Sequence, residues 1–562
     1  MFLKKIRFIL IITLFYQTPL FSKSASLNDF NAQNLSEYFS GIVAFENKDN
    51  AEALEFFNSS RILIENHDPY LKRYLYSLVL ENKINKAINL VKSNKERENT
   101  NFFDAYLLLV LDNLKKGDFK KAYDQLNELT DIVNDKDRFN SAILESLRQY
   151  IYVFKEKVIL NDKKSFGKLS IISETFQRCY LGDFATDAFF SELINDKEGN
   201  YIRYIFFYLV YLTENNRIND VKNFTNNLDY LNTTLLISQA KSWVENGNYE
   251  KLTKFFSCKN PNDIIGEFLF LVSNIYSSQD NFEKSNFYLN LSNFFNPKFI
   301  FNLSLVAENQ YLNQDYKKAK KTLKNFRKDN DFYYWYRIKK EAQILEIEKN
   351  KKESLNYIFL HFNKITKPNN KILFDIANFY RNSKKYEEAI NYYTKLINSL
   401  EDDSVMKSDL LYRRGGSYER GGNYEKADKD LLNALDINPD DAYILNYLAY
   451  SWLERDYKID DAIEMLEKAY KLENNDPYII DSIGWAYYLV NDYLKAEKLI
   501  KRAVELMPED PIVNDHYGDI LWMLDRKIQA RYFWGNVLEM ENTENEMIEN
   551  INKKMIEGLK NS

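Results

Sequence analysis

The side chains that most often carry out chemistry are scarce in this chain. It contains three histidines, His67, His361 and His516, and two cysteines. The histidines are isolated from one another and from the cysteines. No HExxH, CxxC, P-loop or GxSxG motif occurs in the sequence. His67 precedes a turn, and the other two fall within helical patterns. Because no set of polar groups converges, the sequence predicts no catalytic residue, no metal site and no cofactor.

The two cysteines, Cys179 and Cys258, lie far apart in the sequence. In an exported protein, two cysteines are able to form one disulfide. The chain also contains helical repeats, however, and contacts in a linear array of repeats are mostly local. Residues so far apart are then not expected to meet. The sequence therefore favours two free, buried thiols, and a single disulfide is the alternative.

A regular period organises the C-terminal part of the chain, from Leu411 to Met540. One small-residue position recurs there in steps of 34, 35 and 34, at Gly415, Ala449, Gly484 and Gly518. A second position recurs at Ala427, Ala462, Ala496 and Ala530. A third recurs at Ala434, Ala469, Ala503 and Val537. A fixed period of this length indicates a helical repeat array, in which small residues let two helices touch.

These units resemble the tetratricopeptide repeat (TPR) family, whose unit is a helix-turn-helix of about 34 residues. In the first unit the family pattern falls on Leu411, Arg414, Gly415, Tyr418, Ala427, Leu431, Ala434 and Pro439, and only Arg414 departs from it. In the third unit it falls without departure on Ile480, Ile483, Gly484, Tyr487, Ala496, Ile500, Ala503 and Pro508. The last repeats look like those of exported TPR proteins of Gram-negative bacteria. The resemblance implies an all-α fold: a right-handed solenoid of antiparallel helix pairs with a C-terminal capping helix.

The resemblance also implies which residues face a ligand. In the TPR family, positions one, five and eight residues past the first bulky site of helix A face the concave groove. The first row is Tyr412, Asn446, Asp481 and Asp515. The second row is Gly416, Tyr450, Trp485 and Asp519. The third row is Glu419, Leu453, Tyr488 and Trp522. Their aromatic, amide and carboxylate groups suit a peptide and favour a basic or backbone-donor ligand. The alternative is that the aromatic residues pack against the next repeat or the cap.

The register of small residues extends backwards from the four C-terminal units. It passes through Ala377, Ala342, Ala307, Ser273 and Ala240. We therefore expect a TPR array over residues 235–540. Degenerate TPR-like repeats are expected over 25–133, and an irregular helical segment, without a clear register, over 134–234.

A capping helix is expected over residues 541–562. Its apolar residues form one stripe, at Ile548, Ile551, Met555 and Leu559. Glu and Lys occupy the other positions, and a polar-faced terminal helix keeps a repeat array soluble.

The N-terminus has the pattern of a secretory signal peptide over residues 1–24. Lys4, Lys5 and Arg7 precede an apolar run over 8–16, and the small residues Ser22 and Ser24 follow. This pattern predicts cleavage after Ser24, with Ser22 as an alternative, or an uncleaved anchor as a further alternative. The apolar run is shorter than the ~20 residues that span a bilayer. We therefore expect a periplasmic or secreted protein without a stable membrane span, and a peripheral place at the envelope membranes stays open.

The composition of the chain excludes one class of partner. Asp and Glu total 82 against 76 Lys and Arg, which gives a net charge of -6. Because nucleic-acid binding normally requires a basic surface, no nucleic acid is expected. The sequence predicts a non-enzymatic, exported scaffold that binds a protein or peptide in its groove. The alternative is a glycan-binding accessory to polymer export or cell-wall synthesis, which would use the same aromatic residues for ring stacking.

Overall fold

The structure is a computed structural model that describes residues 32–559, except 66–67, 97, 133–136, 197–201, 227, 230, 232, 329, 401–403 and 542. The predicted signal peptide lies outside the described residues. Within them, every regular element is a helix and no strand occurs. The prediction of an all-α solenoid of antiparallel helix pairs is confirmed. The chain forms two compact units, which are described separately: unit 1 contains residues 1–228 and 233–348, and unit 2 contains 229–232 and 349–562.

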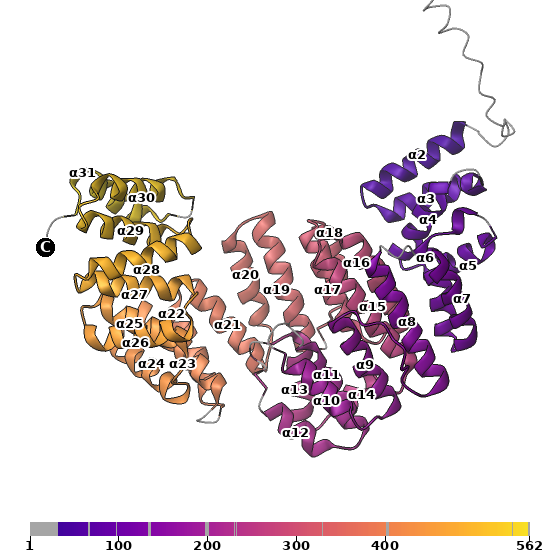
Figure 1. Ribbon diagram of the computed structural model, residues 1–562, viewed down its shortest axis with the longest axis horizontal. Coiled ribbons are helices and arrows are strands. Elements are labelled where there is room, and N and C mark those ends of the chain that lie inside the picture. Colours follow the sequence, from indigo (N-terminus) through magenta and orange to yellow (C-terminus); the bar gives the residue numbers. More distant parts are fainter. Residues whose placement is uncertain are drawn as a thin grey trace, which may run out of the picture. The chain divides into compact units, whose positions relative to one another are not determined.

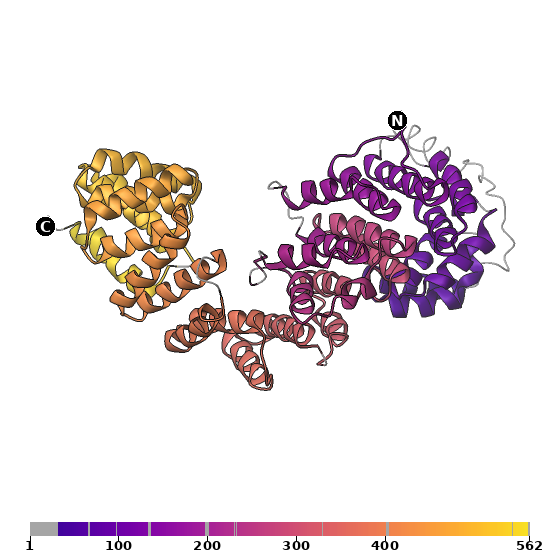
Figure 2. The same ribbon diagram turned by 90° about the horizontal axis from the view of Figure 1, so that it is seen from below.

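Unit 1 begins with helix pairs and continues into an irregular stretch before the pairs resume (Figures 1 and 2). Its α-helices are α2 (Ala32–Glu46), α3 (Asn50–Ser59), α4 (Asp68–Leu80), α5 (Ile84–Asn94), α6 (Phe103–Lys115), α7 (Phe119–Ile132), α8 (Arg138–Glu156), α9 (Lys168–Leu181), α10 (Thr186–Ile194), α11 (Arg203–Glu214), α12 (Ile218–Asn226), α13 (Leu235–Glu245), α14 (Glu250–Phe255), α15 (Pro261–Ser277), α16 (Phe282–Phe295), α17 (Leu303–Leu312), α18 (Tyr316–Leu323) and α19 (Asp331–Glu348). Short 3-10 helices cover Arg61–Glu65, Glu98–Thr100 and Ile300–Asn302.

Unit 2 is more regular and contains the four repeats with the clearest sequence period. Its helices are α20 (Lys351–Phe362), α21 (Asn370–Asn382), α22 (Tyr386–Ile397), α23 (Val405–Arg420), α24 (Tyr424–Ile437), α25 (Ala442–Glu454), α26 (Ile459–Leu472), α27 (Pro477–Leu489), α28 (Tyr493–Leu506), α29 (Pro511–Met523), α30 (Lys527–Glu539) and α31 (Asn545–Glu557). The division between the units falls inside the range 235–540, so α13–α19 belong to unit 1 and α20–α30 to unit 2.

The small residues lie where the two helices of a pair cross. In the last repeat, a Cβ atom added to Gly518 of α29 would lie 2.3 Å from Nε1 of Trp534 on α30. The same addition to Gly484 would lie 2.6 Å from Ile500. In each case the two residues are 16 positions apart, and so are Gly41 and Phe57 in unit 1. Glycine is therefore required here by the closeness of the neighbouring helix.

The chain of unit 1 returns on itself, so that its second helix pair contacts α16 (Figure 2). The ring of Tyr76 on α4 stacks on that of Phe287, with the centroids 4.7 Å apart. Asn290 of α16 donates hydrogen bonds to the carbonyl oxygens of Val79 and Leu80, at 2.9 and 3.1 Å. These contacts join segments that a linear array of repeats would keep separate.

The preferred interpretation of the cysteines is wrong, because Cys179 and Cys258 form a disulfide. Cys179 lies on α9 and Cys258 follows α14, and their Cα atoms are 5.5 Å apart. Free thiols would be expected only if contacts were confined to neighbouring repeats. In the irregular part of unit 1, α9 instead packs against α15, which brings the two buried sulfur atoms together.

Replacing Gly518 with alanine should destabilise unit 2 by about 1–3 kcal/mol, because the rigid, fully buried indole of Trp534 cannot move aside easily. The matched control is Gly535→Ala on α30, where a Cβ atom would meet nothing within 4 Å. That change should raise the stability by about 0.5–1 kcal/mol, since glycine weakens a helix interior. Chemical denaturation of both variants measures the difference, and equal stabilities would contradict the close approach.

Reducing the disulfide should lower the free energy of unfolding by about 2–4 kcal/mol, because the cross-link restricts the unfolded chain. Thermal unfolding with and without reductant measures this loss. A double variant, Cys179→Ala with Cys258→Ala, is the control and should not respond to reductant. A native protein that also fails to respond would show that the bond is absent or adds nothing.

Candidate functional site

The nine predicted ligand residues lie on one side of α23, α25, α27 and α29, which we call the helix-A face. They are Tyr412, Asn446, Tyr450, Asp481, Trp485, Tyr488, Asp515, Asp519 and Trp522. N-terminal caps set the register of the last three helices. Asp441, Asp476 and Asp510 each accept hydrogen bonds from two backbone N–H groups, at 2.9–3.1 Å. Each cap lies five residues before a residue of the first row, so equivalent side chains occupy equivalent places.

An aromatic stack occupies the middle of the helix-A face. The ring of Trp485 is nearly parallel to that of Tyr488, with centroids 4.5 Å apart, and to that of His516, at 4.0 Å. Trp485 and Tyr488 lie on α27, whereas His516 lies on α29. The stack therefore joins two successive repeats, and the faces of Trp485 are already engaged inside the protein.

The stacked histidine is also paired with a carboxylate. His516 Nδ1 lies 3.0 and 3.1 Å from the two carboxylate oxygens of Asp481, and both side chains are buried. Burial by itself disfavours the charged imidazole. The neighbouring carboxylates of Asp481, Asp515 and Asp519 outweigh burial and raise the pKa of His516 above its usual value. The pair thus links two helices A.

The capping helix engages the last three predicted ligand residues. Lys554 of α31 contacts Asp515 at 2.6 Å and Asp519 at 2.8 Å. Asp519 also accepts a hydrogen bond from Trp534 Nε1 at 3.0 Å. Burial, together with the charge of Asp515, raises the pKa of Asp519 to about 6. These two carboxylates already have a cation from the same chain, which weakens the expectation that they select a basic ligand.

Trp522 is covered by the residues that end the cap. Gly558 has a φ of +73°, and a Cβ atom there would lie 1.9 Å from the Trp522 ring. Ile551 of α31 is fully buried. The predicted cap therefore packs on this end of the helix-A face.

The first repeats of the helix-A face remain partly accessible. Tyr412 is half-buried, and its ring meets that of Tyr447 edge-on at 5.5 Å. Tyr450 is also half-buried, and burial raises its pKa. The side-chain oxygen of Asn446 is buried without a hydrogen-bond partner among the described residues. Tyr447 also donates a hydrogen bond to the Glu419 carboxylate at 2.9 Å, which links α25 to α23.

The most exposed row of this face is not among the residues predicted from the sequence. Tyr443, Tyr478 and Ile512 have exposed fractions of 55%, 61% and 51%. Each lies two residues after a capping aspartate and three before a first-row residue, so it shares a helix side with the predicted rows. Their regular spacing, one repeat apart, was a signal that could have identified them. Large apolar side chains held outward in successive repeats form a surface suited to protein contact.

The other candidate groups are less suited to a functional role than the helix-A face. His67 lies outside the described residues, and His361 lies on α20 beside Tyr357. In the part of the chain that the structure describes, no cluster of His, Cys, Asp or Glu is arranged to hold a metal ion. None of the helices described is both long and apolar enough to cross a membrane.

We expect His516 to titrate above pH 6.5, and Asp481→Asn to lower that pKa by removing the nearest carboxylate. Because the folded-state pKa is raised, the pair contributes stability below pH 6.5 that is lost as the pH rises through the folded value. NMR titration of a chain with only three histidines measures this directly. The control is Asp525→Asn, an exposed carboxylate in the same repeat; an equal effect of both variants would contradict the pairing.

Comparison with known proteins identifies the repeats. The family model described as tetratricopeptide repeat matches residues 371–399 and 408–441. A TPR repeat-containing protein of Pseudomonas aeruginosa is 32% identical over 111 residues, which are 20% of this chain. The match spans only about a fifth (19%) of that relative's length.

Two solved structures are among those similar to part of this chain. A thermophilic TPR protein in Thermus thermophilus has a TM-score of 0.30 at 14% identity, covering 34% of this chain and 100% of its own. MamA from Desulfovibrio magneticus RS-1 has a TM-score of 0.28 at 20% identity, covering 32% and 99%. Its matched segments therefore show that this chain contains tetratricopeptide repeats over residues 371–399 and 408–441.

Proposed function

We propose that this protein is an exported scaffold of the bacterial envelope that binds a segment of another protein on the helix-A face of unit 2. TPR folds generally serve protein–protein interaction rather than catalysis. The observation that carries the proposal is the outward row of Tyr443, Tyr478 and Ile512. Aromatic and aliphatic anchors of this kind provide much of the energy of protein contacts.

The side chains that remain accessible on the helix-A face indicate what kind of partner segment it would bind. Asp481 is paired with His516, and Asp515 and Asp519 with Lys554, so the face offers few free carboxylates to a basic ligand. The accessible groups are instead the outward row and the half-buried Tyr412 and Tyr450. A partner segment with apolar side chains suits this surface better than a strongly basic one.

Export is supported by two independent features. The N-terminal residues have the charged, apolar and small-residue order of a signal peptide. Cys179 and Cys258 are disulfide-bonded, and such bonds persist mainly in oxidising compartments such as the periplasm. A periplasmic place is the location most consistent with both.

The alternative of glycan binding on the helix-A face is less well supported. Sugar rings would have to stack on exposed aromatic faces. Trp485 already has two nearly parallel rings within 4.5 Å, and Trp522 lies beneath Gly558. Neither tryptophan presents a free platform.

A photoreactive amino acid at position 478 should cross-link a defined partner segment in envelope extract. The triple variant Tyr443→Ala, Tyr478→Ala, Ile512→Ala should lose at least about tenfold of the capture of that partner by the purified chain, because truncating several anchors costs more than about 1.4 kcal/mol. Mass spectrometry identifies the segment.

The mature chain recovered from the periplasm should begin at Ala25.

The matched control is Leu494→Ala, Ile528→Ala, Tyr532→Ala, which removes three exposed apolar side chains from α28 and α30. This control should retain the partner. Equal capture by both triple variants, or the same cross-links from positions 478 and 528, would refute the helix-A face as the binding surface.

A further inference from the structure

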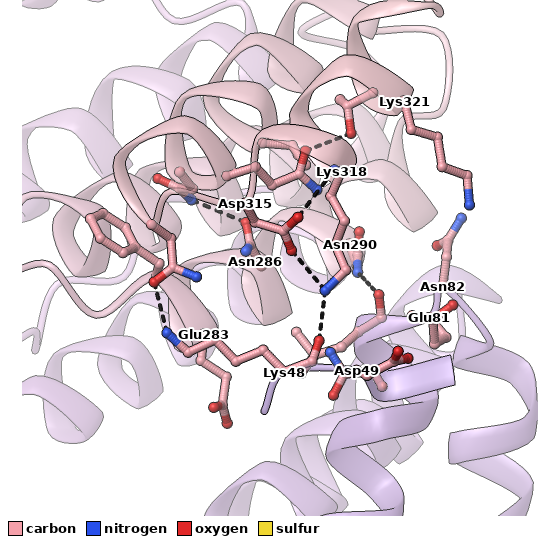
Figure 3. Close-up of a pocket in the computed structure, with 18 of the residues that line it drawn as sticks. Lys48, Asp49, Glu81, Asn82, Glu283, Asn286, Asn290, Asp315, Lys318 and Lys321 are labelled. Atoms are coloured by element: carbon pink, nitrogen blue, oxygen red, sulfur yellow. Dashed lines mark hydrogen bonds and ion pairs between the residues drawn. The ribbon is translucent and has the colours of Figure 1, made fainter. Parts of the chain in front are cut away.

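A separate cavity of about 810 Å³ lies in unit 1, where the chain returns on itself. One wall consists of the turns between α2 and α3 and between α4 and α5. The other consists of α16, α17 and α18 (Figure 3). Its volume is within the range of about 300–1,000 Å³ that is typical of small-ligand sites. It belongs to a different unit from the helix-A face, so the inference below is independent of the proposed function.

Hydrogen bonds between distant segments hold the two walls together. Lys318 Nζ donates to the carbonyl oxygen of Lys48 at 2.7 Å, and Lys48 Nζ donates to Asn313 Oδ1 at 2.7 Å. Asn290 donates to the end of α4, as described above. Figure 3 shows Lys48, Asn290 and Lys318 between the two walls. The bridges also limit how long a ligand could extend along the cavity.

The lining is rich in amide side chains. Eleven of the 26 lining residues are Asn or Gln. Asn286, Asn290 and Asn293 repeat at steps of four and three, so they share one face of α16. Asn309, Gln310 and Asn313 line the cavity from α17. An amide presents both a donor and an acceptor, as a hydroxyl group does. Asn309 and the Asn290 amino group are already hydrogen-bonded within the protein. The groups left for ligand hydroxyls include Asn286 Nδ2, Gln310 Nε2 and the Asn293 amide.

The charged and apolar residues of the cavity also indicate what kind of ligand it would accept. Lysines and carboxylates both line it, and Lys318 is paired with Asp315 at 2.9 Å. Five carboxylates and three lysines line it, so the small excess of negative charge disfavours an anionic ligand. Phe45, Phe282 and Leu303 contribute an apolar surface, against which the C–H face of a sugar ring could pack.

We propose that this cavity binds a short, neutral oligosaccharide. Its amides would hydrogen-bond the hydroxyl groups, and the apolar surface would cover one ring face. An extended peptide could also pair with amides, but it needs a continuous path, and the Lys48 and Lys318 bridges cross between the walls. The bounded shape and the density of amides favour the saccharide.

The test uses the full mature chain and a panel of neutral trisaccharides built from glucose, galactose, mannose or N-acetylglucosamine. A neutral hexapeptide of Ala, Gly and Ser is the comparison ligand. The pocket variant is Asn286→Ala with Asn293→Ala. Asn286 accepts one bond from Asn309, which keeps its second bond to Ser285. Neither change removes a bond between the walls. The matched control is Asn85→Ala with Asn89→Ala, two exposed amides of α5 outside the cavity.

At least one trisaccharide should bind the native chain with a Kd of about 1 mM or tighter in calorimetry. The pocket variant should weaken that binding by about tenfold or more, and the α5 control should not change it. Circular dichroism establishes that all three chains are equally folded. The proposal is overturned if no member of the panel binds saturably, if the pocket variant binds as tightly as the native chain, or if only the hexapeptide binds.

Discussion

The close crossing of the two helices within each pair is the constraint on which the structure depends. At Gly518, Gly484 and Gly41, the helix-B side chain sixteen positions later occupies the space that a Cβ atom would need. Where the sequence has alanine, as at Ala377 and Ala449, the residue is fully buried. A helix pair has little core of its own, so this contact fixes the angle at which each pair meets its neighbour. Small residues recur at a fixed period in the sequence because this crossing recurs in each repeat.

This dependence explains what the sequence could predict. Local rules determine the helices, because small residues, turn residues and apolar periodicity act within the length of one repeat. The all-α fold and the four C-terminal repeats could therefore be predicted from Gly415 to Ala530. The TPR family pattern placed Asn446, Asp481, Trp485 and Tyr488 on the helix-A face. It did not reveal that Tyr443, Tyr478 and Ile512 are the exposed members, because the choice of rows came from the pattern of other TPR proteins.

The rest depends on contacts between residues far apart in sequence, which a period does not encode. The disulfide joins Cys179 to Cys258 because an irregular stretch of helices brings α9 to α15. The polar cavity of unit 1 exists because α16 reaches the end of α4. Likewise, the pairing of Asp515 and Asp519 with Lys554 depends on where the cap lies. In each case the residues were visible in the sequence, but their partners were not.

The return of α16 onto the second helix pair also changes how unit 1 can come apart. A solenoid whose repeats touch only their neighbours can fray from either end, one repeat at a time. In unit 1, the bonds from Asn290 and Lys318 tie the first two helix pairs to helices that lie far later in the chain. Loss of the first pairs would break contacts in the middle of the array as well. Unit 1 should therefore open as one cooperative block, whereas unit 2, whose helices pack mainly in chain order, is free to unravel progressively.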